Sequence, residues 1–190
     1  MPKAPFQTAA LLALAILTFP AHAQDAKKDA AVKPADSPSQ AVLGAWNDIG
    51  RKLIAMAEDF PEDKYDFKPT PAQRTFAEQL LHVAGSNYYL TYPVRGDKTK
   101  VDENPSRSVY KTKADVVAYV KKSFADGAAA IQAKGDKGLN DLIVDPFAHQ
   151  QARISDLAYG FIEHSGEHYG QLVVYYRLSG LVPPESRPKK

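Results

Sequence analysis

The sequence of 190 residues contains no cysteine. Disulfide scaffolds, thiolate zinc sites, iron–sulfur clusters and cysteine nucleophiles are therefore excluded. Any metal site must use histidine, aspartate or glutamate side chains, and noncovalent packing alone must hold the fold together.

The sequence also lacks a large excess of charge of one sign. Lys and Arg together number 24 and Asp and Glu 22, which gives a net charge of +2 at pH 7. A polybasic nucleic-acid binder of the usual kind is therefore excluded, and we expect no nucleic-acid partner. Apolar residues make up 44% of the chain, enough for the core of one domain.

Long hydrophobic runs are absent except near the N-terminus. Residues 9–19 (AALLALAILTF) follow Lys3 and precede Ala21-His22-Ala23, a small-x-small cleavage site. This pattern predicts a secretory signal peptide at residues 1–23, cleaved near Ala23, and the run is too short for an ordinary membrane span. We expect an exported protein, periplasmic or secreted, with no stable membrane anchor.

Residues 24–37 are rich in Ala, Lys and Asp and contain no aromatic side chain. This composition is typical of a flexible linker. The linker ends at Ser37, which has the properties of a helix N-cap, so we expect the folded domain to span residues 38–186.

Local signals predict four helices in this domain. Three of them begin with a Ser or Thr that is followed three residues later by Gln, Glu or Asp, the pattern of a capping box. The helices are expected at about 38–59, 75–92, 112–134 and 155–179, with ends near Pro61, Pro93, Gly135 and Gly180. Residues 139–152 fit either a helical turn or an extended stretch. The pattern predicts an all-α fold, a four-helix bundle with long inter-helix connections.

The last predicted helix carries two histidines on its apolar face. On a wheel of about 100° per residue, His164 and His168 share a stripe with Leu157, Phe161 and Leu172. Burying each imidazole without a partner costs roughly 1–3 kcal/mol. Histidines at i and i+4 can share one metal ion, although a core pair hydrogen-bonded to Tyr or Glu fits the same pattern.

A tight metal site needs a third ligand. His149 lies in the unassigned segment, and His82 lies in the second predicted helix, roughly opposite that helix's apolar face. His82 is therefore either a surface histidine or one that faces the last helix at an open edge of the bundle. The wheel alone leaves both interpretations open.

Three segments resemble the DinB-like family, four-helix proteins related to the bacterial thiol transferases: TFAEQLLHVA at 75–84, HSGEHYGQL at 164–172 and YRLSGLVPP at 176–184. The resemblance covers nearly all of residues 38–186. It implies a DinB-like fold and a metal triad of one histidine from the second helix and two from the last, here His82, His164 and His168.

Three histidine ligands leave coordination positions open, as in catalytic sites. Zinc or nickel suits neutral imidazoles best, and iron or manganese is also compatible. Glu167 lies near the His164 side of the wheel and is a candidate general base, unless it is simply solvated. Glu78 and Tyr89, on the helix of His82, are further candidates for the surroundings of the metal.

The resemblance implies a metal-dependent enzyme, either a transferase or a hydrolase acting on a small-molecule ligand. Transfer of a low-molecular-weight thiol fits export poorly because such thiols are kept reduced in the cytosol. The alternative is a non-catalytic metal-binding or small-ligand-binding domain. Residues 164–168 also match the inverted zincin pattern H-x-x-E-H, but its further acidic ligand would have to be Glu185 in a proline-rich tail. The sequence leaves open whether the protein forms a homodimer.

Overall fold

Capping boxes begin three helices where the sequence predicts them. In the computed structural model, which describes residues 33–188, the hydroxyls of Ser37, Thr75 and Thr112 each accept a hydrogen bond from the backbone N–H three residues on. The side chain at that third position bonds back to the backbone of the capping residue, which closes each box. The helices that begin there are α1 (Pro38–Asp59), α2 (Phe76–Ser86) and α4 (Lys113–Gly138).

The predicted signal peptide, residues 1–23, lies outside the described residues, as does most of the predicted linker, residues 24–37. The described part of the linker before Ser37 is exposed to solvent. Within residues 33–188, no helix combines the length and the apolar character that a membrane crossing requires.

The second predicted helix is interrupted, and the prediction that Pro93 ends it is wrong. Helix α2 stops before Asn87, whose buried side-chain amide donates to Ser123 Oγ at 3.3 Å, and α3 (Tyr88–Arg95) follows. Pro93 lies inside α3, where its missing N–H removes a single hydrogen bond near the helix end. Gly96 ends α3 in the left-handed conformation, at φ 71°.

The end of α4 is joined to the beginning of α1. Regular helix reaches Gly135, the predicted end, where φ is 58°, and a short helical stretch continues to the last residue of α4. The Asp136 carboxylate just beyond this kink accepts hydrogen bonds from Ser37 Oγ and from Ser39 N, both at 2.8 Å. These bonds satisfy donors at the first turn of α1.

The segment that the sequence leaves open, residues 139–152, contains extended structure. Strands β1 (Leu142–Val144) and β2 (Gln151–Arg153) pair antiparallel in a short hairpin. Strand β2 leads directly into α5 (Ile154–Leu178), the helix that carries the histidine pair. The hairpin therefore fixes the N-terminal end of α5.

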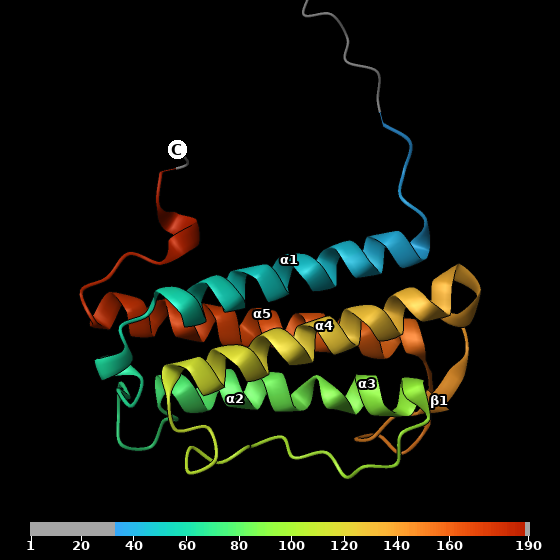
Figure 1. The fold of residues 1–190 in the computed structure, drawn as a ribbon. Coiled ribbons are helices and arrows are strands. Elements are labelled where there is room, and N and C mark those ends of the chain that lie inside the picture. Colours follow the sequence, from blue (N-terminus) through green and yellow to red (C-terminus); the bar gives the residue numbers. More distant parts are fainter. Residues whose placement is uncertain (1–32, 189–190) are drawn as a thin grey trace, which may run out of the picture. The chain divides into compact units, whose positions relative to one another are not determined.

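Helix α1 packs against α4 and α5, and α2 and α3, which follow one another along the bundle (Figure 1), pack against the same two helices. Together α2 and α3 take the place of the second predicted helix. Large apolar side chains from these helices meet in one core, and the fully buried ones include Trp46, Leu53, Phe76, Leu81, Ile131 and Tyr176. The architecture is the predicted all-α four-helix bundle with long connections.

Candidate metal centre

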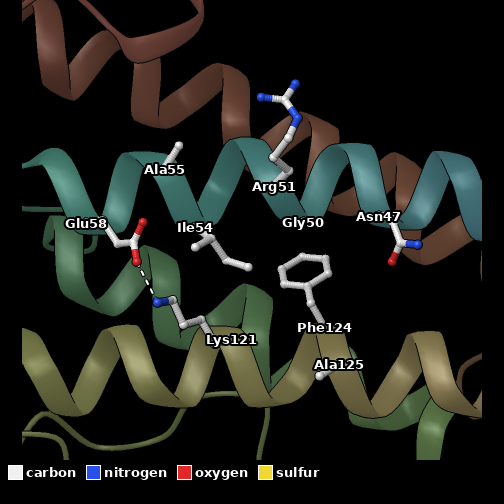
Figure 2. Close-up of a pocket in the computed structure, with 9 residues that line it drawn as sticks. All are labelled: Asn47, Gly50, Arg51, Ile54, Ala55, Glu58, Lys121, Phe124 and Ala125. Carbon is white, nitrogen blue, oxygen red and sulfur yellow. Dashed lines mark ion pairs between the residues drawn. The ribbon is translucent and has the colours of Figure 1, made fainter.

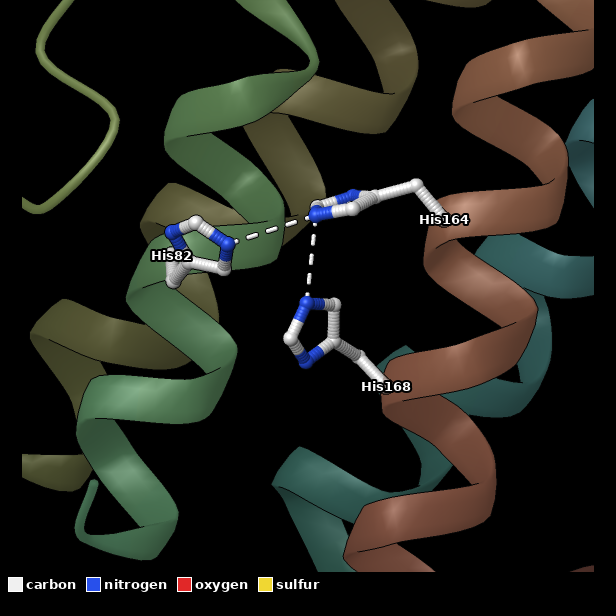
Figure 3. A group of neighbouring side chains, drawn as sticks. All are labelled: His82, His164 and His168. Atoms are coloured by element: carbon white, nitrogen blue, oxygen red, sulfur yellow. Dashed lines mark hydrogen bonds between the residues drawn. The ribbon is translucent and has the colours of Figure 1, made fainter. Parts of the chain in front are cut away.

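The structure brings His82, His164 and His168 together between α2 and α5 (Figure 3). His164 Nε2 lies 3.3 Å from His82 Nε2 and 3.1 Å from His168 Nε2. One ring nitrogen from each histidine lies within 4.8 Å of the others. Helix α2 therefore turns His82 toward α5, the second of the two orientations that the sequence left open.

The spacing of the three nitrogens suits a shared metal ion. Two nitrogens bound to one ion at about 2.1 Å lie about 3.0 to 3.4 Å apart for bond angles between octahedral and tetrahedral. The observed separations of 3.1 and 3.3 Å fall in this range. In the described part of the chain, no other group of three metal-ligating side chains lies this close together.

A backbone carbonyl sets the tautomer of His82. Its Nδ1 lies 2.9 Å from the carbonyl oxygen of Glu103. A carbonyl only accepts, so Nδ1 carries the proton and the neutral ring directs the Nε2 lone pair at the other two histidines. This is the arrangement that orients histidine ligands in metal sites.

The two histidines of α5 have no such partner. His164 Nδ1 and His168 Nδ1 are buried and have no hydrogen-bond partner of good geometry among the described residues. The side chain of Gln171 is the hydrogen-bonding group that acts on His168, where it raises the pKa against the larger effect of burial. A pair of core histidines hydrogen-bonded to Tyr or Glu was the alternative interpretation, and the described residues provide neither partner. The three converging imidazole nitrogens could therefore hold a divalent metal ion.

The surroundings favour the neutral form of all three imidazoles. Burial is the main cause that lowers their pKa values, and the neighbouring imidazoles lower the pKa of His164 and His168 further. The pKa of His168, the most buried of the three, falls to about 4. The positive charge of Arg74 lowers each pKa as well. Neutral imidazole is the form that binds metal, so the cluster is ready for ligation at neutral pH.

The two glutamates that the sequence singles out, Glu167 and Glu78, differ in their relation to the histidines. Glu167 is exposed on α5, and its negative charge acts on His164, raising the pKa of that imidazole against the larger effect of burial. Glu78 is not a partner of His82, which corrects that expectation. Its carboxylate accepts a hydrogen bond of 2.7 Å from Thr75 N and closes the capping box of α2.

The other candidates lie away from the cluster. His149 is exposed in the turn of the hairpin, in the left-handed conformation at φ 54°. Glu185, the acidic ligand that an inverted zincin would need, accepts a hydrogen bond of 2.6 Å from Arg51 Nη1. The inverted zincin interpretation therefore loses its further ligand.

A cavity of about 450 Å³ lies between α1 and α4 (Figure 2). It is lined in part by Gly50, Ile54 and Phe124, and the ion pair between Lys121 Nζ and Glu58 Oε1, 2.5 Å long, joins the two helices at one end of it. No histidine lines this cavity, so the candidate chemistry remains with the cluster between α2 and α5.

We expect Gly85→Ala to weaken metal binding without removing a ligand. A Cβ on Gly85 would lie 2.5 Å from the backbone oxygen of Asp102. The connection between α3 and α4, which passes over α2 at this point, would therefore have to shift. That shift would displace the Glu103 carbonyl from His82. Loss of such a supporting hydrogen bond typically lowers metal affinity by about 10- to 100-fold. Competition with a chromophoric zinc chelator measures the change.

The matched control is Gly127→Ala at the contact of α4 with α1. A Cβ on Gly127 would lie 2.1 Å from Trp46 Cζ2, so this variant also introduces a clash and lowers the thermal midpoint. Its zinc affinity should stay within about twofold of the parent, since the connection over α2 is untouched. An equal loss of affinity in both variants would assign the effect to general destabilisation.

A four-helix bundle in which three histidines from two helices converge belongs to the class of helical bundles that can hold a metal ion between their helices. The family model of the DinB superfamily matches residues 45–172. The chain belongs to this superfamily, as the resemblance of its helix motifs predicts. A search of curated proteins found no match.

Solved structures share this fold at low sequence identity. A DinB-like protein from Bacillus cereus ATCC 10987 is 18% identical, with a TM-score of 0.63, over 76% of this chain and 95% of that chain. The DinB-like protein YjoA from Bacillus subtilis is 17% identical, with a TM-score of 0.59, over 78% and 99%. YfiT from Bacillus subtilis, described as a probable metal-dependent hydrolase with an unusual four-helix bundle topology, is 14% identical, with a TM-score of 0.59, over 79% and 94%.

Proposed function

We propose that the protein binds one divalent metal ion through His82, His164 and His168 and hydrolyses a small-molecule substrate. The observation that carries the proposal is the convergence of three Nε2 atoms, with the His82 lone pair aimed at the centre by the Glu103 carbonyl. Zinc or nickel suits this all-imidazole donor set best, and iron or manganese is compatible with it. The description of YfiT as a probable metal-dependent hydrolase supports the reaction class.

A divalent ion bound by the three imidazoles would supply a Lewis acid for a carbonyl or phosphoryl oxygen and would activate water. The chain's own residues supply the rest of the site. The three neutral imidazoles would hold the ion, and the Glu103 carbonyl fixes the ring of His82. The positive charge of Arg74, which acts on all three histidines, favours an anionic group at this site.

Water is the proposed nucleophile because of the predicted export. The signal peptide at residues 1–23 would place the protein in the periplasm or outside the cell, where low-molecular-weight thiols are not kept reduced. Glu167 is the proposed base that accepts the proton from this water, since it is exposed and its charge acts on the neighbouring His164.

The proposed base can be tested with one substitution. Glu167→Gln is expected to lower kcat by about 10²- to 10⁴-fold, because the amide cannot accept a proton as the carboxylate does. Metal content should be unchanged, since Glu167 is not one of the three proposed ligands. The control is Glu163→Gln, which removes another exposed carboxylate of α5 next to His164. Glu163→Gln should keep the turnover of the parent. If Glu167→Gln also keeps it, or if both variants lose turnover equally, Glu167 is not the base.

The function itself is tested with purified protein loaded with zinc or nickel and offered panels of carboxylic esters, amides and phosphoesters. We expect turnover in at least one panel, and its loss together with the metal in the His168→Ala variant. Stoichiometric metal without turnover in any panel would favour the alternative, a non-catalytic metal-binding domain. Turnover that persists in the His168→Ala variant would contradict a role for the cluster.

A further inference from the structure

Three aromatic rings extend from the histidine cluster toward the solvent. Phe161 lies on α5 one turn before His164, and the centroids of their rings are 6.3 Å apart. Tyr89, on α3, stacks near Phe161 at 6.3 Å. Phe147, in the turn between β1 and β2, lies 4.9 Å from Tyr89 and 6.3 Å from Phe161. We call Tyr89, Phe147 and Phe161 the aromatic wall.

The aromatic wall becomes more exposed with distance from the histidines. Phe161 is 5% exposed, Tyr89 is half-buried, and Phe147 is 61% exposed. Turns normally carry polar or small residues at their tips, so a large exposed ring there leaves apolar surface in water. The accessible part of the wall is therefore Phe147 with part of Tyr89, and the buried ring of Phe161 connects it to His164.

The position of Phe147 is fixed by its turn. The carboxylate of Asp145 accepts hydrogen bonds from Phe147 N at 2.7 Å and from Ala148 N at 2.9 Å. The backbone N–H of Asp145 donates to Gln150 O at 2.8 Å, which closes the turn. These bonds fix the backbone that carries Phe147, and its ring lies against Tyr89, so less conformational entropy is lost when a ligand binds.

Other exposed apolar side chains of the hairpin do not share this arrangement. Val144 is 62% exposed, about as much as Phe147, yet it is aliphatic and contributes no ring to the wall. Val144 is therefore a matched control, because it lies in the same hairpin and shares the exposure but not the ring contacts.

We propose that the aromatic wall binds a flat apolar group of the substrate, so that the metal centre acts on small molecules with an aromatic or similarly planar group beside the bond that is cleaved. This inference rests on the proposed function, because the wall selects substrates only if chemistry occurs at the three histidines. Stacking on the wall would hold the substrate with its reactive group toward His164.

Two metal-binding probes isolate the contribution of the wall. Acetohydroxamate and benzohydroxamate bind zinc through the same two oxygens and differ only in a methyl or a phenyl group. Titration calorimetry on zinc-loaded protein gives a Kd for each probe. The ratio of the acetohydroxamate Kd to the benzohydroxamate Kd reports how much affinity the phenyl group adds. We expect Phe147→Ala to weaken benzohydroxamate about five- to tenfold and to leave acetohydroxamate unchanged. Phe147→Tyr should keep the parent ratio, and so should Val144→Ala.

The outcomes separate this inference from the proposed function. If the parent protein takes up neither zinc nor nickel, the proposed function fails and the inference fails with it. If zinc binds and Phe147→Ala leaves the ratio of the two Kd values unchanged, the inference alone is overturned. The same conclusion follows if Val144→Ala lowers the ratio as much as Phe147→Ala does, since the effect then does not depend on the ring.

Discussion

The His164→Leu/His168→Leu double variant is expected to lose metal binding, with a Kd at least about 10³-fold higher, and to keep its fold. Two of the three proposed ligands are removed, and a single histidine does not hold a divalent ion tightly. Leucine fits the apolar stripe of α5, where the buried residues Leu157, Phe161 and Leu172 flank the two positions. Metal analysis after equilibrium dialysis measures occupancy, and circular dichroism checks the helix content.

His149→Asn serves as the control for this variant. His149 lies in the hairpin turn at φ 54°, a conformation that asparagine tolerates, so the substitution removes a histidine without straining the backbone. Its metal content should equal that of the parent. Full metal occupancy in the double variant would mean that the ion binds elsewhere.

Metal-free protein is expected to lose stability as the pH falls from about 6.5 toward about 4, and the double variant to lose much less. Burial and the neighbouring imidazoles lower the pKa of His164 and bring that of His168 to about 4. In the unfolded chain histidine titrates near about 6.5. Below that pH the unfolded chain takes up protons that the folded cluster does not, so the free energy of unfolding decreases until the folded pKa is reached. Above about pH 6.5 this effect vanishes.

Urea unfolding in the presence of a chelator measures this difference at several pH values. Carboxylates titrate alike in both proteins, so the difference between the two urea midpoints isolates the histidines. We expect the midpoint of the double variant to gain about 0.5 M or more over the parent between pH 7 and pH 4.5. Parallel curves for the two proteins over this range would show that the two imidazoles are not held neutral by the fold.

The beginnings of the helices and the histidine pair could be predicted because they depend on local signals. The capping boxes at Ser37, Thr75 and Thr112 form as expected, and the periodicity of α5 places His168 in the core. The prediction that the helix ends at Pro93 is wrong because proline is tolerated near the end of a helix, where few hydrogen bonds remain to be lost.

The orientation of His82 could not be predicted from its own helix. A helical wheel assumes one buried face, but α2 is buried on almost all sides. The side opposite the apolar stripe therefore also faces protein, and it carries His82 toward α5. The resemblance to the DinB-like family provided what the wheel lacked.

The partner of His82 had no sequence signal at all. Glu103 lies in the connection between α3 and α4, where no periodicity marks any position. Its carbonyl reaches His82 because Gly85 lets the connection pass close over α2. A backbone contact of this kind depends on tertiary packing and is independent of the Glu103 side chain, so no reading of residue types reveals it.

Anomalous diffraction at the zinc edge from crystals of the zinc-loaded protein tests the three-histidine site most directly. We expect one strong peak between α2 and α5, about 2.0–2.1 Å from the Nε2 atoms of His82, His164 and His168. Zinc bound elsewhere in the chain, or a peak that leaves out His82, would contradict the site described above.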